Sequence, residues 1–208
     1  MQIQGVNIQD MINQSIAVLK PWPTVQTFEQ FEKRGGTREA LIYVGVASAV
    51  AAVVAFVFGL LGGIGGAIAA LIIGFVSPII GFAVFAYVLF YVAKNQGGTG
   101  TQDEVFYTLS LFTAPIRAFT GVVGAIPILG CLFMPVNLVL SIYQGYLAYL
   151  ACRASMNMEK NPAIISVVVA VVVMFIISAI VAGILGAIFV GMAVATGASR
   201  SVEAQRAP

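Results

Sequence analysis

Histidine is absent from this 208-residue chain, and cysteine occurs only twice. Without histidine, the chain has no His-based acid–base pair, no Ser-His or Cys-His nucleophile and no imidazole metal ligand. The two cysteines, Cys131 and Cys152, are about 21 residues apart. In a helix that rises about 1.5 Å per residue they would lie roughly 30 Å apart, well beyond the reach of a disulfide. We expect both to be small apolar packing residues.

Charge is also scarce. Charged residues make up 9% of the chain and the net charge is +2, whereas a soluble domain has about 25% charged residues. A net charge this small gives no reason to expect nucleic-acid binding. The hydrophobic share of 60% is more than a soluble surface could tolerate without aggregation.

Long apolar runs account for that composition. About 20 apolar residues are needed to cross the bilayer core as a helix, and lipid allows no other open backbone structure. The sequence therefore predicts an all-α, polytopic transmembrane bundle with the lipid bilayer as its surroundings. We expect five spans, at residues 40–61, 66–93, 105–126, 128–151 and 163–194. Pro127 and Pro135 make the fourth span the least regular of the five.

The distribution of lysine and arginine predicts the orientation. With the N-terminus inside, seven cationic residues face the cytoplasm and two, Arg200 and Arg206, face out. The opposite orientation inverts this ratio, so the positive-inside rule favours N-in, C-out. The chain then divides into a cytosolic segment (residues 1–39), a five-helix membrane domain (residues 40–194) and a flexible C-terminal tail (residues 195–208).

The cytosolic segment begins with a predicted amphipathic helix at residues 7–20. Its apolar residues recur at helical spacing, and Trp22 follows in a Pro-Trp-Pro turn; the apolar set is Ile8, Met11, Ile12, Ile16 and Leu19. Two interpretations stay open. The helix lies along the cytoplasmic membrane interface, which we predict, or it packs on the protein's own cytosolic surface.

A glycine-rich loop separates the second and third predicted spans. It contains Gly97, Gly98 and Gly100. Thr101 and Glu104 then match a capping box at the start of a helix. No Lys-Ser/Thr pair follows, so a phosphate-binding P-loop is not indicated, and we expect a structural loop and cap.

Small residues recur every four positions in several spans. Such spacing lets helix backbones approach closely. We expect intramolecular packing for most of these residues; the alternative is a homo-oligomer contact through the fifth span, at Gly183, Ala187 and Gly191.

Arg117 is the one charge placed well inside a predicted span. A cation at the bilayer centre costs about 2.5–3.5 kcal/mol on insertion scales. The guanidinium either snorkels to the outer headgroups or faces the bundle, where the fourth span offers Asn137, Ser141 and Gln144 as hydrogen-bond partners. We predict the second arrangement, which makes these four residues a candidate intramembrane polar cluster. The predicted spans contain no Asp, Glu or His, so we expect neither an enzyme nor a cofactor or metal site.

The order of these features resembles the Yip family, five-span membrane proteins named as Ypt/Rab-interacting. The resemblance rests on Pro21-x-Pro23-Thr24-x-x-x-Phe28 before the first span, and on Pro115 in the third span. It also rests on Gly97-Gly98-x-Gly100-Thr101-x-x-Glu104 before that span. The resemblance implies a cytosolic N-terminus, five spans and, in eukaryotic members, binding of small GTPases and shaping of ER–Golgi membranes.

The sequence thus favours a non-enzymatic membrane-organising or protein-interaction role, with a membrane-protein partner or a second copy as binding partner. The short tails and the spans rich in Ala, Gly and Val are typical of prokaryotic members, which predicts a prokaryotic cell membrane. The chain lacks the long acidic or aromatic-rich N-terminal domain of the eukaryotic members, which argues against small GTPase binding. The alternative is a small channel or transporter subunit that uses Arg117 and the polar residues of the fourth span.

Overall fold

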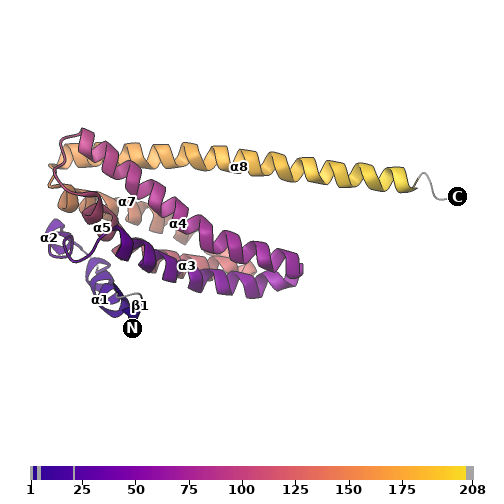
Figure 1. Cartoon of the computed structure of the whole chain (residues 1–208), viewed down its shortest axis with the longest axis horizontal. Helices are drawn as coiled ribbons and strands as arrows, with labels where there is room; N and C mark the ends of the chain where they lie inside the picture. The colour runs from indigo at the N-terminus through magenta and orange to yellow at the C-terminus, as the bar shows by residue number, and fades with distance from the viewer. Residues whose placement is uncertain (1, 4–5, 21, 205–208) are drawn as a thin grey trace. The chain divides into compact units, whose positions relative to one another are not determined.

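The computed structural model describes residues 2–3, 6–20 and 22–204, with side chains for residues 6–20, 22–181 and 183. Nearly all of this is helix (Figure 1). The elements in order are β1 (Gln2–Ile3), β2 (Val6–Asn7), α1 (Ile8–Val18), α2 (Val25–Glu29), α3 (Thr37–Gly59), the short 3-10 helix η1 (Leu60–Gly62), α4 (Ile64–Asn95), α5 (Gln102–Ala125), α6 (Pro127–Leu132), α7 (Met134–Met156) and α8 (Lys160–Ala204). β1 and β2 form one short antiparallel pairing.

Among the described residues, four helices are long and apolar enough to cross a membrane: Thr37–Gly62, Ile64–Asn95, Gln102–Ala125 and Lys160–Val181. The expected all-helical architecture with membrane-spanning helices is therefore present, and four of the described helices meet this requirement of length and composition. The predicted fourth span, residues 128–151, is not a single helix. It is divided into α6 and α7, and Phe133 lies between them. Prolines explain the break, since Pro127 and Pro135 sit in the first turns of α6 and α7 and proline is accommodated where no helical N–H bond is needed.

α3 and α4 form a hairpin in which small residues bring the backbones together (Figure 1). A methyl group added at Gly59 would lie 2.8 Å from Ala67 Cα, and one at Gly74 would lie 3.4 Å from Ala52 Cα. α5 approaches α3 in the same way, because a methyl group at Gly121 would lie 2.5 Å from Ala51 Cβ. The small residues in these helices thus serve intramolecular packing, which supplies the contact that lipid does not drive.

α5 lies at the centre of the packing. It contacts α1, α3, α4, α6 and α7. The eight residues Val105–Phe112 are all buried, so two turns of the helix are covered by protein on every side. Edge-to-face ring pairs join α5 to α4 through Phe82 and Phe106, at 5.8 Å, and to α2 through Phe28 and Phe112, at 6.3 Å.

α1 packs on the bundle through a partly polar face. Gln14 and Ser15 are buried beside Ile8, Met11 and Val18. The two polar side chains meet tyrosine hydroxyls: Tyr107 donates to Gln14 Oε1 at 3.0 Å, and Ser15 Oγ lies 2.9 Å from Tyr43 Oη.

The apolar residues of α1 are therefore divided between two faces. Ile12 and Ile16 are 39% and 58% exposed, and the neighbouring Trp22 is 92% exposed. The sequence pattern placed both isoleucines on one face with Ile8 and Met11, and placed Gln14 opposite. The observed buried face is rotated because α3 and α5 supply hydroxyl partners.

The contacts divide the chain into two compact units, Met1–Ala170 and Val171–Pro208. The first unit includes the start of α8, where Ala163, Val167 and Ala170 are buried at helical spacing. The helix itself continues to Ala204. The oligomer contact suggested for Gly183, Ala187 and Gly191 falls largely outside the described side chains, and the last four residues of the predicted tail, 205–208, lie outside the described residues.

Candidate functional site

The glycine-rich loop joins three helix ends at one end of the bundle, which we call the loop end. Gly97 has a φ of 92°, a conformation that favours glycine. Gly98 and Gly100 leave no room for a side chain: a methyl group at either would collide with Ser155 or Met156 at the end of α7. Thr99 N donates to Met156 O at 3.0 Å. The loop therefore fixes the end of α7 beside the start of α5.

The cap predicted at the start of α5 is present. Thr101 N donates to Glu104 Oε2 at 2.8 Å, and Glu104 N donates to Thr101 Oγ1 at 3.3 Å. The adjacent Asp103 accepts from both the backbone N and the hydroxyl of Thr37, at 2.9 and 2.6 Å. The first turns of α3 and α5 are thereby held together.

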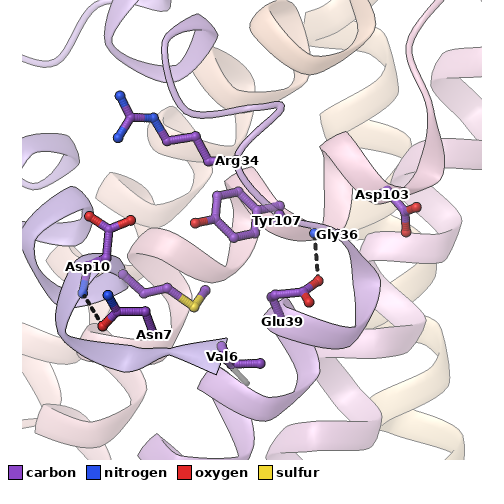
Figure 2. Close-up of a pocket in the computed structure, with 10 residues that line it drawn as sticks. Val6, Asn7, Asp10, Arg34, Gly36, Glu39, Asp103 and Tyr107 are labelled. Carbon is purple, nitrogen blue, oxygen red and sulfur yellow. Dashed lines mark hydrogen bonds between the residues drawn. The ribbon is translucent and has the colours of Figure 1, made fainter. Parts of the chain in front are cut away.

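A pocket of about 470 Å³ opens at the loop end between α1, the α2–α3 connection and α5 (Figure 2). Asp10, Glu39 and Asp103 give its lining more negative than positive charge, since Arg34 is the one cation among the lining residues. All three carboxylates already accept hydrogen bonds: Asp10 from Gln14 Nε2 at 2.7 Å, Glu39 from Gly36 N at 2.9 Å, and Asp103 from Thr37. No cluster of three potential metal ligands occurs among the described residues. This lining serves chiefly to join α1, α3 and α5.

Glu32 is a buried carboxylate near the loop end, in the segment between α2 and α3. It is 7% exposed, and its Oε2 has no hydrogen-bond partner among the described residues. Lys33 lies 3.8 Å from its other oxygen, with a largely exposed side chain. Burial raises the pKa of Glu32 above its usual range, and the nearby charge of Glu104 raises it further. Sequence reasoning did not select Glu32, because its burial depends on how α2 packs.

A second pocket, of about 310 Å³, lies among α3, α4, α5 and α7 and contains Arg117. We call it the Arg117 pocket. Its polar side chains are Ser48, Arg117, Thr120 and Asn137; its small or proline residues are Ala51, Ala55, Gly74, Pro78 and Gly121. Ser48 Oγ is buried and has no partner among the described residues.

The structure brings two members of the predicted polar cluster to one pocket. Arg117 and Asn137 both line it, whereas Ser141 and Gln144 are not among its lining residues. The Arg117 side chain is exposed, and among the described residues it makes none of the expected hydrogen bonds to Asn137, Ser141 or Gln144. Ser141 Oγ donates to the backbone oxygen of Asn137 at 2.8 Å, so its hydroxyl is used within α7. Ser48 and Thr120 were not selected from the sequence, since hydroxyl residues in apolar helices are common and only packing places them beside a cation.

The family model of the Yip1 domain matches residues 16–182 of the chain. The chain belongs to the Yip family. This Yip family match covers α3 to α7 and much of α8, together with the loop end and the Arg117 pocket. The glycine-rich element that suggested the resemblance has a packing role in this Yip protein, since it seats α5 against the end of α7. No curated protein and no solved structure matches the chain. The apolar helices and the family together identify an integral membrane protein.

Proposed function

We propose that this chain is a non-enzymatic membrane-organising protein of the Yip type, with α1 as a helix embedded in the cytoplasmic interface. The outer face of α1 carries the proposal. Ile12, Ile16 and Trp22 are exposed while the opposite face is bonded to the bundle. A shallow apolar helix of this kind inserts into one leaflet and responds to curvature.

The depth of α1 agrees with this role. Its partners Tyr43 and Tyr107 lie in the second turns of α3 and α5, about 8–9 Å from the helix starts at 1.5 Å per residue. Interfacial helices sit about 5–10 Å into the boundary between headgroups and acyl chains. Because hydrogen bonds hold α1 on the bundle, the helix would stay inserted in the interface and would not dissociate from it.

We further propose five spans with the N-terminus in and the C-terminus out, in a prokaryotic cell membrane. α7 supplies the fifth crossing. It starts just after the far end of α5 and ends at the loop end, where Thr99 bonds Met156. Its 23 residues would span about 34 Å as a helix. Its polar residues Asn137, Ser141 and Gln144 reduce its apolar character, and its buried residues lie in its second half, from Leu147 to Met156.

Native cysteines provide a test of topology. Cys131 in α6 is exposed and Cys152 is buried, so an impermeant maleimide added to intact cells should label Cys131 from outside. Cys131→Ser should abolish labelling, and Cys152→Ser should leave it unchanged. A reporter at the C-terminus should be active only outside. A cytoplasmic C-terminus would limit the chain to four crossings and contradict the proposal for α7.

The membrane-organising role is tested in vesicles. Reconstituted wild-type protein should reduce vesicle diameter or produce tubules, and Ile12→Asp/Ile16→Asp should lose this activity while remaining folded. Gln9→Glu/Asn13→Asp is the matched control, because it adds two charges to exposed polar positions of the same helix. Equal remodelling by the isoleucine variant and the wild type would refute a role for the outer face.

A small channel or transporter subunit is the second candidate, favoured by the Arg117 pocket within the bundle. This candidate predicts solute flux across vesicles containing the protein, and loss of that flux in Arg117→Gln. The membrane-organising role predicts remodelling without flux. A homo-oligomer through α8 is compatible with either role, and we propose no small GTPase partner and no cofactor.

A further inference from the structure

The Arg117 pocket combines a cation with open hydrogen-bond donors and has no carboxylate in its lining. Arg117 comes from α5, Ser48 from α3 and Asn137 from α7. The three side chains therefore converge from separate helices, and the pocket exists only in the packed bundle.

The charge in this pocket lacks a counter-charge. Among the described residues, the Arg117 side chain has no hydrogen bond and no ion pair; the bond recorded at Arg117 uses its backbone oxygen, which accepts from Thr120 Oγ1 at 3.5 Å. Glu104, the acid that precedes it on α5, is 13 residues away, or roughly 20 Å along the helix. An unpaired cation at membrane depth is costly, so an anion that enters the pocket gains strongly from the charge.

The neutral groups around Arg117 are also donors without partners. Ser48 is 1% exposed, lines the pocket and has no partner for its hydroxyl among the described residues. The Asn137 side-chain amide has none in the described part of the chain, since the side-chain bond at Asn137 ends on its backbone oxygen. Thr120 makes only the long bond to its own helix. Ser48 is the buried one of the three, since Thr120 and Asn137 are half-exposed. A buried donor without an acceptor is unfavourable, and an oxyanion in the pocket would accept from Ser48 and from the other two donors at once.

We propose that the Arg117 pocket binds the phosphate group of an anionic ligand. A guanidinium presents paired N–H donors that match two oxygens of a phosphate. Ser48 and Asn137, on other helices, then bond the remaining oxygens. Ala51, Gly74 and Gly121 also line the pocket, and none of them brings a large or acidic side chain into it.

Two sources could supply this phosphate: the headgroup of an anionic phospholipid and a free phosphate compound. The pocket lies among membrane helices, which makes a lipid headgroup the expected source. The proposal does not depend on the membrane-organising role, because it concerns the opposite half of α5 from the surface that α1 covers.

The experiment uses the full chain in nanodiscs of neutral phosphatidylcholine, with thermal unfolding as the readout. Phosphatidylglycerol is titrated into the discs in one arm, and inorganic phosphate is added to phosphatidylcholine discs in the other. We expect a saturable rise in the unfolding midpoint with phosphatidylglycerol for the wild type. Saturation by inorganic phosphate alone would assign the pocket to a soluble phosphate instead, with the same residues responsible.

Variants establish where the anion binds. Arg117→Gln and Ser48→Ala should weaken the response by about 10- to 100-fold in half-saturating concentration, the range expected for a lost hydrogen bond to a charged group. Lys160→Gln is the matched control, because it removes an exposed cation outside the pocket and should respond as the wild type does. If Arg117→Gln does not fold, Ser48→Ala provides the test with the charge intact.

Two results would overturn the proposal. One is the absence of a saturable response to either anion in the wild type. The other is an equal response in the wild type, Arg117→Gln and Ser48→Ala, which would mean that the anions act on the general surface charge. In either case the Arg117 guanidinium would reach the outer headgroups, or it would donate to the backbone carbonyl of Gly74. That carbonyl lacks its usual helical donor because Pro78 has no N–H.

Discussion

Gly100→Ala tests the packing at the loop end. A methyl group at this position would run into the carbonyl of Ser155, and Met156 Cα would lie 3.0 Å away. These are backbone atoms at the end of α7, so no rotation of a side chain can relieve the contact. The loop must move away from α7, and the hydrogen bond from Thr99 N to Met156 O is the first interaction to be lost.

The size of the effect follows from these two contributions. Overpacking of a closely packed contact costs about 1–3 kcal/mol, and a lost backbone hydrogen bond adds about 0.5–1.5 kcal/mol. The sum is about 2–4 kcal/mol, which for a chain of 208 residues corresponds to a midpoint lowered by roughly 5–15 °C.

Thermal unfolding of the purified protein in detergent measures this shift. Gly81→Ala on α4 is the matched control, since nothing lies within 4 Å of a methyl group there and alanine is a good helix former. It should unfold within a few degrees of the wild type. A Gly100→Ala protein as stable as the Gly81→Ala protein would refute the close contact between the loop and α7.

Three further perturbations test other parts of the structure. Glu32→Gln should be more stable than the wild type at pH 7 and equal to it near pH 4. The raised pKa of Glu32 means that the folded state favours the protonated acid, so wild-type stability falls as pH rises above the usual value of 4.5. A difference in stability between the two proteins that does not change with pH would contradict this. Tyr107→Phe should lower the free energy of unfolding by about 1–3 kcal/mol, because it leaves the Oε1 atom of the buried Gln14 without its donor. Tyr91→Phe on the exposed face of α4 should leave the free energy of unfolding unchanged. Phe28→Ala should cost about 3–5 kcal/mol and open the connection between α1 and α3 to protease, since Phe28 is fully buried against Phe112; unchanged proteolysis would mean that α2 is held by other contacts.

Features that depend on local sequence were predictable. The Thr101 and Glu104 cap needs only residues three apart, and it occurs where expected. The long apolar runs likewise predicted membrane helices, because their length alone meets the bilayer requirement. The break in the fourth predicted span was underestimated, since Pro127 and Pro135 each start a new helix instead of bending one.

Features that depend on distant partners were not predictable. The predicted orientation of α1 was wrong in detail because Gln14 was placed on the polar face, and only the fold reveals the hydroxyl of Tyr107 beside it. The unusual cost of Arg117 could be inferred from its position in an apolar run. Its surroundings could not, because Ser48 lies 69 positions earlier in the chain and reaches the same pocket only when α3 packs on α5.

The central position of α5 has a consequence for biogenesis. Its best membrane-spanning window has a mean hydropathy of 1.2, against 2.5, 2.5 and 3.3 for the other three candidate spans, and its first turns touch protein instead of lipid. As it leaves the translocon, α5 therefore has the weakest tendency of the four to partition into lipid by itself. The α3–α4 hairpin is synthesised earlier and is already available to receive it, and α1 and α2, which also precede it in the chain, pack against its first half. We therefore expect insertion of this protein to be cooperative, with the least apolar of these four helices entering the bilayer through contacts with neighbours that were inserted before it.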